Sequence, residues 1–267
     1  MSWVDERTGP VVLADVRWYL DGRSGRAAYD AGHIPGAVFV DLDRWLAGEA
    51  SPESGRHPLP EPETFAAGMS ALGIGEDSRV VAYDDEGGVI AARLVWMLRV
   101  TGHEAALLDG GLQTYHGPLE RDAPRSVKAT FTPRPWPPHR LADIDDASDP
   151  ANTVIDARAP ERYRGDLEPV DARAGHIPGA RNVACRANLD QAGRFLPAET
   201  LRHQFLAAGV TDGKSTISYC GSGVTACHNL IAMELAGFGG GRLYAGSWSQ
   251  YSHASTRPVA TGSAPGS

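Results

Sequence analysis

Ala31-Gly32-His33-Ile34-Pro35-Gly36-Ala37 occurs a second time in the chain as Ala174-Gly175-His176-Ile177-Pro178-Gly179-Ala180. Upstream of each copy, at residues 11–17 and 154–158, an apolar run leads into Asp-x-Arg. An apolar run of this length is typical of a buried strand, and an identity of seven consecutive residues is not expected by chance. The repeat therefore predicts that the chain is a duplicated domain.

The two halves continue to match beyond this motif. A second apolar strand follows in each half, at residues 80–83 and 216–219, and both halves close with a glycine-containing turn, Gly110-Gly111-Leu112 and Gly246-Ser247-Trp248. Helical stretches separate the strands. This alternation predicts an α/β fold of two tandem domains, each a mostly parallel sheet flanked by helices, with ligands bound at the carboxyl ends of the strands.

The composition of the chain changes between the two copies. Residues 118–150 have no helical period and are rich in proline, which predicts an extended linker on the surface. We therefore expect an N-terminal domain at 1–117 and a C-terminal domain at 151–252. Small and polar residues dominate 253–267, where we expect a flexible tail.

The overall composition is that of a globular protein. Of the 267 residues, 42% are hydrophobic, which is enough to bury a sizeable core. The net charge of −8 argues against a nucleic-acid or anionic-membrane partner. The sequence shows neither an apolar run of about 18 residues nor the pattern of a signal peptide, so we expect a cytoplasmic protein without a membrane partner. The 3 cysteines are an odd number, which in a reducing compartment argues against a disulfide framework, and the lack of paired Cys-x-x-Cys motifs argues against a bound metal ion such as zinc.

One cysteine lies where a strand turns into a helix. Cys220 follows a short apolar strand at 215–219 and precedes an apolar helical stretch at 229–236. The loop between them contains two glycines and can turn backbone N–H groups toward the sulfur, while the positive end of the helix dipole stabilises an anion there. These are the surroundings of a thiolate nucleophile; a small buried hydrophobic side chain is the alternative.

The corresponding position of the first half carries Asp84, followed by Asp85 and Glu86. Three consecutive carboxylates would repel an anion, so the first domain is predicted to be catalytically inactive. It either lines a cleft with the second domain, which is a common place for a small-molecule site, or contributes only to stability.

The chain resembles the rhodanese superfamily over nearly all of residues 8–252, and in particular its two-domain sulfurtransferases with an active C-terminal domain. The resemblance rests on Cys220-Gly221-Ser222-Gly223-Val224-Thr225-Ala226, on the doubled Gly-His-Ile-Pro-Gly-Ala and on Gly246-Ser247-Trp248-Ser249. In that family the cysteine takes a sulfane sulfur from a donor, holds it as a persulfide and passes it to cyanide, a thiol or thioredoxin. The resemblance thus implies an enzyme with Cys220 as its nucleophile and with neither a metal nor an organic cofactor.

The resemblance also bears on the sulfur donor. Thiosulfate-preferring members place Arg and Lys directly after the cysteine, where this chain has Gly221 and Ser222. That neutral pair looks like the 3-mercaptopyruvate sulfurtransferases, whose donor carries one carboxylate; thiosulfate is the alternative donor. Ser222 would hydrogen-bond the donor's keto oxygen or relay a proton, unless it is merely a turn residue. The loop residues expected to contact the bound donor are Gly221, Gly223, Val224 and Thr225.

A donor carboxylate requires a cation, and Arg162 matches the position of a substrate-binding arginine in the family. A second family arginine lies about nine residues further on, where this chain has Asp171. Arg173 lies nearby and is a better candidate for the second role than Arg164, although both also fit ordinary surface charges.

The remaining histidines and cysteines are weaker candidates. His33 and His176 belong to the duplicated turn, which favours a structural role, and His33 is also a candidate for a proton relay with Ser222. Cys227 is expected to pack inside the helix that follows Cys220 rather than to act as a resolving cysteine, and Cys185 has no assigned role.

Two other classes of protein have to be compared with a sulfurtransferase. Phosphatases of a related kind also hold a cysteine in an anion-binding loop, but they need an arginine at the sixth position after it, where this chain has Ala226. A non-catalytic persulfide carrier remains the alternative to an enzyme. The expected partners are a small-molecule sulfur donor, mercaptopyruvate or thiosulfate, and a thiol or thioredoxin-like acceptor.

Overall fold

The computed structural model describes residues 10–122, 124 and 127–266, and the chain divides into two compact units. The N-terminal unit consists of the chain up to Ala47, Pro60–Trp136 and Ala192–Arg194. The C-terminal unit consists of Gly48–Leu59, Pro137–Gln191 and the chain from Phe195 onward. This division differs from the expected boundaries, because the expected linker is split at residue 137 and because Gly48–Leu59, the 48–59 segment, belongs to the C-terminal unit. Residues 1–9 of the expected first domain and residue 267 of the expected tail lie outside the described part.

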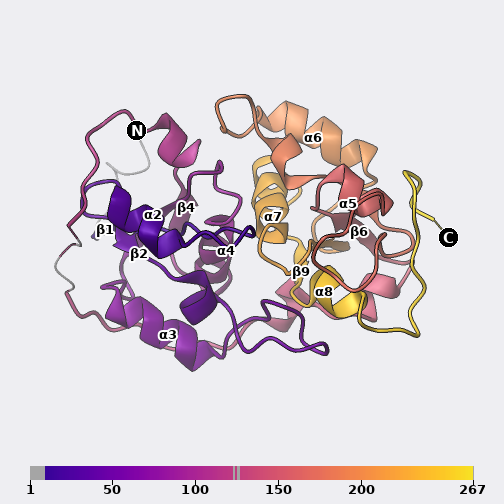
Figure 1. Ribbon diagram of the computed structural model, residues 1–267, viewed down its shortest axis with the longest axis horizontal. Helices are drawn as coiled ribbons and strands as arrows, with labels where there is room; N and C mark the ends of the chain where they lie inside the picture. The colour runs from indigo at the N-terminus through magenta and orange to yellow at the C-terminus, as the bar shows by residue number, and fades with distance from the viewer. Residues whose placement is uncertain (1–9, 123, 125–126, 267) are drawn as a thin grey trace. The chain divides into compact units, whose positions relative to one another are not determined.

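The N-terminal unit is built on a parallel 4-stranded sheet with the strand order β2–β1–β3–β4. Figure 1 labels β1, β2 and β4 of this sheet. Strand β3 reads Arg-Val-Val-Ala-Tyr and is buried along its whole length, as expected of a central strand that is covered on both faces. The strands are β1 (Val11–Asp15), β2 (Val38–Phe39), β3 (Arg79–Tyr83) and β4 (Ala105–Leu107). The helices are α2 (Gly25–Ala31), α3 (Pro62–Ala71) and α4 (Ala92–Val100), with the short helical turns η1 (Leu42–Leu46) and η2 (Gly111–Thr114).

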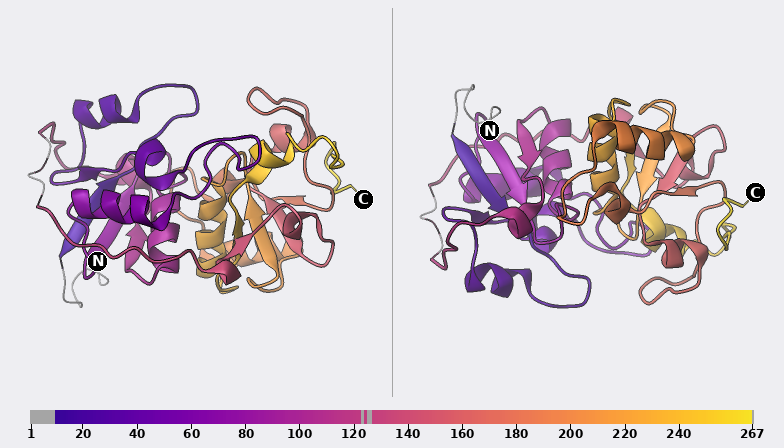
Figure 2. Two further views of the ribbon diagram at one scale, coloured as in Figure 1. Left: turned by 90° about the horizontal axis from the view of Figure 1, so that it is seen from below. Right: turned by 90° about the horizontal axis from the view of Figure 1, so that it is seen from above.

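The C-terminal unit repeats this plan with one more strand, in the order β5–β9–β8–β6–β7. The strands are β5 (Leu141–Ala142), β6 (Thr153–Asp156), β7 (Arg181–Asn182), β8 (Thr216–Tyr219) and β9 (Arg242–Tyr244), and all pairs are parallel. The helices are α5 (Pro160–Arg164), α6 (Ala198–Ala207), α7 (Ala226–Leu235) and α8 (Ser247–Tyr251), with the turns η3 (Pro138–Arg140), η4 (Asp146–Ser148) and η5 (Cys185–Asn188). Helices flank the sheet of each unit (Figure 2), so the predicted α/β fold of two tandem domains is confirmed.

The Asp-x-Arg pairs explain why both repeats form the same turn. Arg158 Nη2 donates to Asp156 Oδ2 at 2.6 Å and to Gly175 O at 2.7 Å. Arg17 makes the equivalent two contacts in the first repeat, at 2.7 and 2.8 Å. The four charged side chains of these pairs are at most 5% exposed. Each buried ion pair therefore ties the end of a strand to the repeated glycine, and removing either partner would leave a buried charge without compensation.

The repeated histidines stabilise the same turn from inside. His33 Nδ1 lies 3.0 Å from Tyr29 O, and the two rings are stacked with their centroids 3.8 Å apart. His176 has the same two contacts with Tyr163, at 2.8 and 3.8 Å. Both histidines are fully buried. Their shared geometry indicates a structural role for both.

The chain that follows each domain pairs with the repeated turn. Glu120 forms an antiparallel bridge with His33, and Ala260 forms the equivalent bridge with His176. Gly179 N also donates to Pro265 O at 2.7 Å. The expectation of a flexible tail over 253–267 is therefore wrong for residues 260–265, because the backbone there is hydrogen-bonded to the domain.

Residues 118–150, which were expected to form a linker, are packed into the two units: residues up to Trp136 belong to the N-terminal unit and those from Pro137 to the C-terminal unit. Trp136 Nε1 donates to Pro60 O at 2.8 Å, and Phe131 packs edge-on against Phe65 in the N-terminal unit. Further on, β5 adds to the C-terminal sheet beside β9. The proline-rich composition predicted the extended backbone but not these contacts.

Helix α7 lies in the interior of the C-terminal unit. Every side chain from Ala226 to Met233 is buried, and the helix packs on β8, β9 and α6. A helix that is buried around its whole circumference is expected to be largely apolar, and its buried polar side chain Asn229 is hydrogen-bonded to Val183 O and Asn188. Within the described ranges, no helix combines the length and the apolar character that crossing a bilayer requires.

Candidate active site

Cys220 lies between the end of β8 and the start of α7, as the sequence predicted. Its Sγ accepts hydrogen bonds from Ser222 N at 3.4 Å and from Gly223 N at 3.1 Å. The residue is only 2% exposed. Two inward N–H groups next to a helix N-terminus stabilise negative charge on the sulfur. Residues 220–226, the Cys220 loop, therefore form an anion-binding site around the sulfur.

The backbone of the Cys220 loop requires a glycine at position 223. Gly223 has a φ of +78°, and a Cβ added there would lie 2.6 Å from Ala245 O. The loop then closes through Cys227 N, which donates to Val224 O, and His228 N, which donates to Thr225 O, both at 3.1 Å. The predicted donor-contacting residues thus shape the loop mainly through their backbone.

Ser247 anchors the nucleophile from the neighbouring turn. Its Oγ accepts from Cys220 N at 3.1 Å and donates to Tyr244 O at 2.8 Å. Ser247 has a φ of +52°, whereas the equivalent residue of the first repeat is Gly111 with a φ of +56°. A left-handed conformation costs a side-chain-bearing residue free energy, which these two hydrogen bonds offset.

The equivalent loop of the first repeat is occupied by its own aspartate. The fully buried Asp84 carboxylate accepts four backbone N–H groups at 2.7 to 2.9 Å, from Glu86, Gly88, Ile90 and Ala91. Burial raises the pKa of Asp84, and the four N–H groups oppose that increase. The first loop thus still binds an anion, but that anion is part of the chain.

Ser222 contacts His57, a histidine that was not among the residues predicted from the sequence. His57 Nδ1 lies 2.7 Å from Ser222 Oγ, and the two residues are 5% and 7% exposed. His57 comes from the 48–59 segment, 165 residues away in the sequence. The only available signal is the length of the connection: residues 40–61 separate β2 from α3, whereas the shorter segment 183–197 separates β7 from α6.

Two arginines lie at the edge of the Cys220 loop. Measured to an ideal Cβ on Gly221, Arg56 Nη2 is 3.1 Å away and Arg162 Nη1 is 3.5 Å away. Asp171 bridges the two guanidinium groups, accepting from Arg56 at 2.7 Å and from Arg162 at 2.9 Å. Glu168 accepts from Arg162 at 2.6 Å. The structure therefore places the predicted Arg162 at the loop together with Arg56, which sequence reasoning missed.

Arg173 has a different function from the predicted one. Its guanidinium donates to four backbone carbonyls at 2.7 to 2.9 Å, those of Tyr251, Ser252, Ala254 and Arg257. These carbonyls lie at and beyond the end of α8, where a helix leaves acceptors without intrahelical partners. The prediction of Arg173 as a donor-binding cation is therefore wrong, because its donors are used to hold this turn.

The other predicted residues are buried in structural positions. His33 belongs to the N-terminal unit and contacts Tyr29, while the histidine in contact with Ser222 is His57. Cys227 lies inside α7, and its Sγ donates to Gly223 O at 3.4 Å. Burial raises the pKa of the Cys185 thiol to about 12. Cys185 is therefore kept protonated and is a poor nucleophile.

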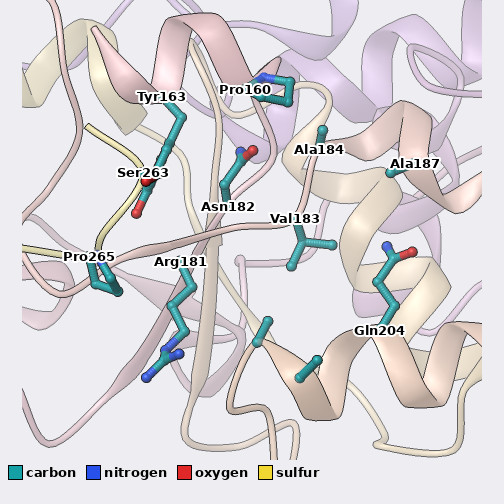
Figure 3. A pocket seen from close by; sticks show the side chains of 12 residues that line it. Pro160, Tyr163, Arg181, Asn182, Val183, Ala184, Ala187, Gln204, Ser263 and Pro265 are labelled. Atoms are coloured by element: carbon teal, nitrogen blue, oxygen red, sulfur yellow. The ribbon is translucent and has the colours of Figure 1, made fainter. Parts of the chain in front are cut away.

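A cavity of about 480 Å³ lies elsewhere in the C-terminal unit, between α5, β7, α6 and residues 263–265 (Figure 3). The N-terminal unit has a counterpart of about 130 Å³ between α2, β2, the end of α3 and Pro124. Cys220 does not line either cavity. Because the repeat that carries Asp84 in place of a cysteine has an equivalent cavity, such a cavity follows from the fold and does not identify a second active site. Among the described residues, no group of three or more His, Cys, Asp or Glu side chains is arranged to hold a metal ion.

Comparison with known families agrees with this geometry. The model of the rhodanese-like domain matches residues 2–117 and 138–254. The chain therefore belongs to the rhodanese-like family, with two such domains in tandem.

Named relatives of the chain are sulfurtransferases. A protein of Pseudomonas aeruginosa named probable 3-mercaptopyruvate sulfurtransferase is 43% identical, over 94% of this chain and 93% of the relative. The putative thiosulfate sulfurtransferase SseB of Mycobacterium tuberculosis is 40% identical, over 96% of this chain and 92% of the relative. The crystal structure of SseA from Escherichia coli, described as a 3-mercaptopyruvate sulfotransferase, has a TM-score of 0.78 and 34% identity, covering 90% of this chain and 93% of that one.

Proposed function

We propose that the protein is a sulfurtransferase that moves a sulfane sulfur from 3-mercaptopyruvate, through a persulfide on Cys220, to a thiophilic acceptor. One observation carries the proposal: the Cys220 sulfur accepts two backbone N–H groups at the start of α7, next to the guanidinium of Arg162. This arrangement combines a stabilised thiolate with a cation for a donor carboxylate. The names of the relatives support the same reaction.

In the first half-reaction, the Cys220 thiolate attacks the sulfur of 3-mercaptopyruvate. A sulfur–sulfur bond forms, the carbon–sulfur bond breaks, and its electron pair passes to the carbon as the enolate of pyruvate. The enolate takes up a proton and leaves as pyruvate. The N–H groups of Ser222 and Gly223 stabilise negative charge on sulfur before and after the transfer.

The proton for this step requires a donor near the loop, and Ser222 with His57 is suited to the task. A hydroxyl 2.7 Å from an imidazole nitrogen can pass a proton to the enolate and recover one from the ring. The Ser222 hydroxyl would also hydrogen-bond the keto oxygen of the donor, where the enolate charge develops.

In the second half-reaction, an acceptor attacks the outer sulfur of the persulfide and Cys220 leaves as a thiolate. Cyanide would give thiocyanate by this step, and a small thiol or a thioredoxin-like protein would give a new persulfide. We propose a cytoplasmic location for the reaction, where thiols such as the three of this chain stay reduced.

The proposal is tested by locating the transferred sulfur. Cys220→Ser is expected to abolish transfer while the protein stays folded, and mass spectrometry of donor-treated wild type is expected to show one added sulfur on Cys220. Cys185→Ser serves as the control and should retain transfer, since its thiol is protonated and buried. Sulfur found on Cys185 or Cys227 instead of Cys220 would contradict the assignment.

Thiosulfate is the second candidate donor, supported by the name of the Mycobacterium tuberculosis relative and by two arginines near Gly221. The choice is tested by steady-state rates with each donor and cyanide as acceptor. Because Gly221 and Ser222 bring no charge into the loop, we expect mercaptopyruvate to be preferred by about tenfold or more in kcat/KM. An equal or greater value for thiosulfate would make thiosulfate the donor.

A further inference from the structure

We propose that Arg56 is the second cation that binds the donor's anionic group, and that Asp171 positions Arg56 and Arg162 as one receptor beside Gly221. The inference deepens the proposed function and rests on it, since it concerns the donor of the same reaction. It assigns a specificity role to the 48–59 segment, which lies in the inactive half of the sequence.

The position of Arg56 is fixed within the C-terminal unit by its neighbours. Arg56 N donates to Ser249 Oγ at 3.0 Å, and the Gln250 side chain donates to Glu53 O. Gly55 has a φ of +85°, and a Cβ added there would lie 2.4 Å from Gly246 O. The segment is thus packed against the turn that begins α8, and this packing leaves Arg56 at the edge of the Cys220 loop.

The hydrogen bonds of the two guanidinium groups leave Nη2 of Arg56 and Nη1 of Arg162 for a ligand beside Gly221; among the described residues, the buried Nε of Arg56 also has no hydrogen-bond partner. Asp171 accepts hydrogen bonds from Nη1 of Arg56 and from Nη2 of Arg162. Glu168 accepts hydrogen bonds from Nε and Nη2 of Arg162. Among the described residues, Nη2 of Arg56 and Nη1 of Arg162 have no hydrogen-bond acceptor. These are the same two nitrogens that lie 3.1 and 3.5 Å from the ideal Cβ position of Gly221. Two N–H groups on neighbouring cations match the two oxygens of one carboxylate.

Gly221 leaves this space open for the donor. A side chain at position 221 would occupy the volume between the two guanidinium nitrogens and the loop. Arg56 and Arg162 therefore reach this space from outside the Cys220 loop. In a loop with an arginine at position 221, the side chain of that arginine would occupy the same space. A bound donor then has its anionic group at the arginines and its sulfur toward Cys220.

Asp171 makes this pair of like charges stable. Its side chain is 1% exposed, and those of Arg56 and Arg162 are 26% and 14% exposed. Two guanidinium groups that share one small site repel each other, and a buried carboxylate between them offsets that repulsion and fixes their orientation. Asp171 is therefore a positioning residue, and Arg56 contacts the donor.

The test compares Arg56→Gln, Asp171→Asn and the exchanged pair Arg56→Asp with Asp171→Arg, using both donors and cyanide. For the donor that the wild type prefers, Arg56→Gln and Asp171→Asn are each expected to raise KM by about tenfold or more, with kcat within about threefold of the wild type. The exchanged pair restores a cation and its carboxylate in the same place, so we expect its KM to fall to within about fivefold of the wild type. Arg164→Gln, which removes a half-exposed pair with Asp166, is the matched control and should leave KM unchanged.

The outcomes separate this inference from the proposed function. If the wild type transfers sulfur and Arg56→Gln keeps the wild-type KM, the inference is wrong while the proposed function stands. A lower melting temperature and a lower kcat at unchanged KM would show Arg56 to be only structural, and would equally overturn it. If the wild type turns over neither donor, the proposed function fails and this inference fails with it.

Discussion

In the proposed mechanism, the 2.7 Å contact between Ser222 Oγ and His57 Nδ1 supplies the proton that the Cys220 thiolate cannot supply. Mercaptopyruvate leaves an enolate that must be protonated, whereas thiosulfate leaves sulfite, which needs no proton. We therefore expect Ser222→Ala and His57→Gln to lower kcat for mercaptopyruvate by about a hundredfold and to change thiosulfate turnover by less than about threefold. Parallel steady-state assays with both donors measure this contrast. Equal losses with the two donors would point to a disturbed loop rather than to proton transfer.

At the scale of single residues, the sequence predicted the positions that follow from the local succession of strand, turn and helix. Cys220 and the glycines of its loop follow from a strand, a turn and a helix in succession, so their roles could be expected. Arg173 was wrongly expected at the site because its nearness to Arg162 in sequence says nothing about its four carbonyl acceptors. The contacts of His57 and Arg56 span 165 and 115 residues of sequence, so no local pattern indicates them, and the length of the segment that carries them is the only signal.

At the scale of the elements, the loop of the first repeat is a natural control for the active one. Asp84 fills its loop with four short hydrogen bonds. Asp84→Ala leaves buried N–H groups without acceptors, and we expect it to lower the free energy of unfolding of the N-terminal unit by about 3 kcal/mol. Asp30→Ala, which removes an exposed pair with Arg26, should cost less than about 0.5 kcal/mol. Denaturant unfolding measures both; similar small effects would show that the loop does not depend on its internal anion.

The attachment of residues 131–134 to the N-terminal unit should depend on pH. His103 stacks on Phe131, and its Nε2 lies 3.5 Å from Glu76, which also pairs with Arg134. Burial, assisted by the Arg134 charge, lowers the pKa of His103 below its ordinary value of 6.5. The unfolded chain then binds a proton at His103 before the folded chain does, so this contribution to stability is present above pH 6.5 and is lost as the pH falls below it.

The measurement is the melting temperature between pH 7.5 and about pH 5, for the wild type and for His103→Gln. The wild type should lose stability more steeply over this range, because the variant lacks the buried His103 imidazole and its lowered pKa, while the other histidines are common to both proteins. Glu76 stays ionised throughout, since its pKa is lowered from 4.5. Parallel curves for the two proteins would contradict a neutral, buried His103.

The elements that the sequence predicted well are those with their own periodicity. The strand expected at 215–219 is β8 at Thr216–Tyr219, and the helix expected at 229–236 is α7 at Ala226–Leu235. β5 is only two residues long and owes its existence to pairing with β9, so no local pattern could indicate it. Proline content predicts extended chain there, whereas the structure places the helical turns η3 and η4 on either side of β5, and the pairing of β5 depends on the sheet that it joins.

At the scale of the whole molecule, the C-terminal unit is not a continuous stretch of sequence, because the 48–59 segment belongs to it. A fragment of residues 137–267 contains Cys220 and its sheet but lacks Arg56 and His57. We expect it to lose mercaptopyruvate turnover by at least about a thousandfold, and a synthetic 48–59 peptide at millimolar concentration to restore part of it, since the covalent chain supplies a high effective concentration. A peptide with His57→Ala is the control and should not restore turnover. Full activity of the fragment alone would refute the role of the segment.

The placement of the 48–59 segment also has an evolutionary consequence. A duplicated gene whose first copy has lost its nucleophile is normally free to lose that copy altogether. Here the C-terminal unit includes the 48–59 segment, which is encoded in the first half, so a deletion of that half also removes Arg56 and His57. If these two side chains act as proposed, recombination at the proline-rich connection gives products without a complete site, and selection would keep the two halves together.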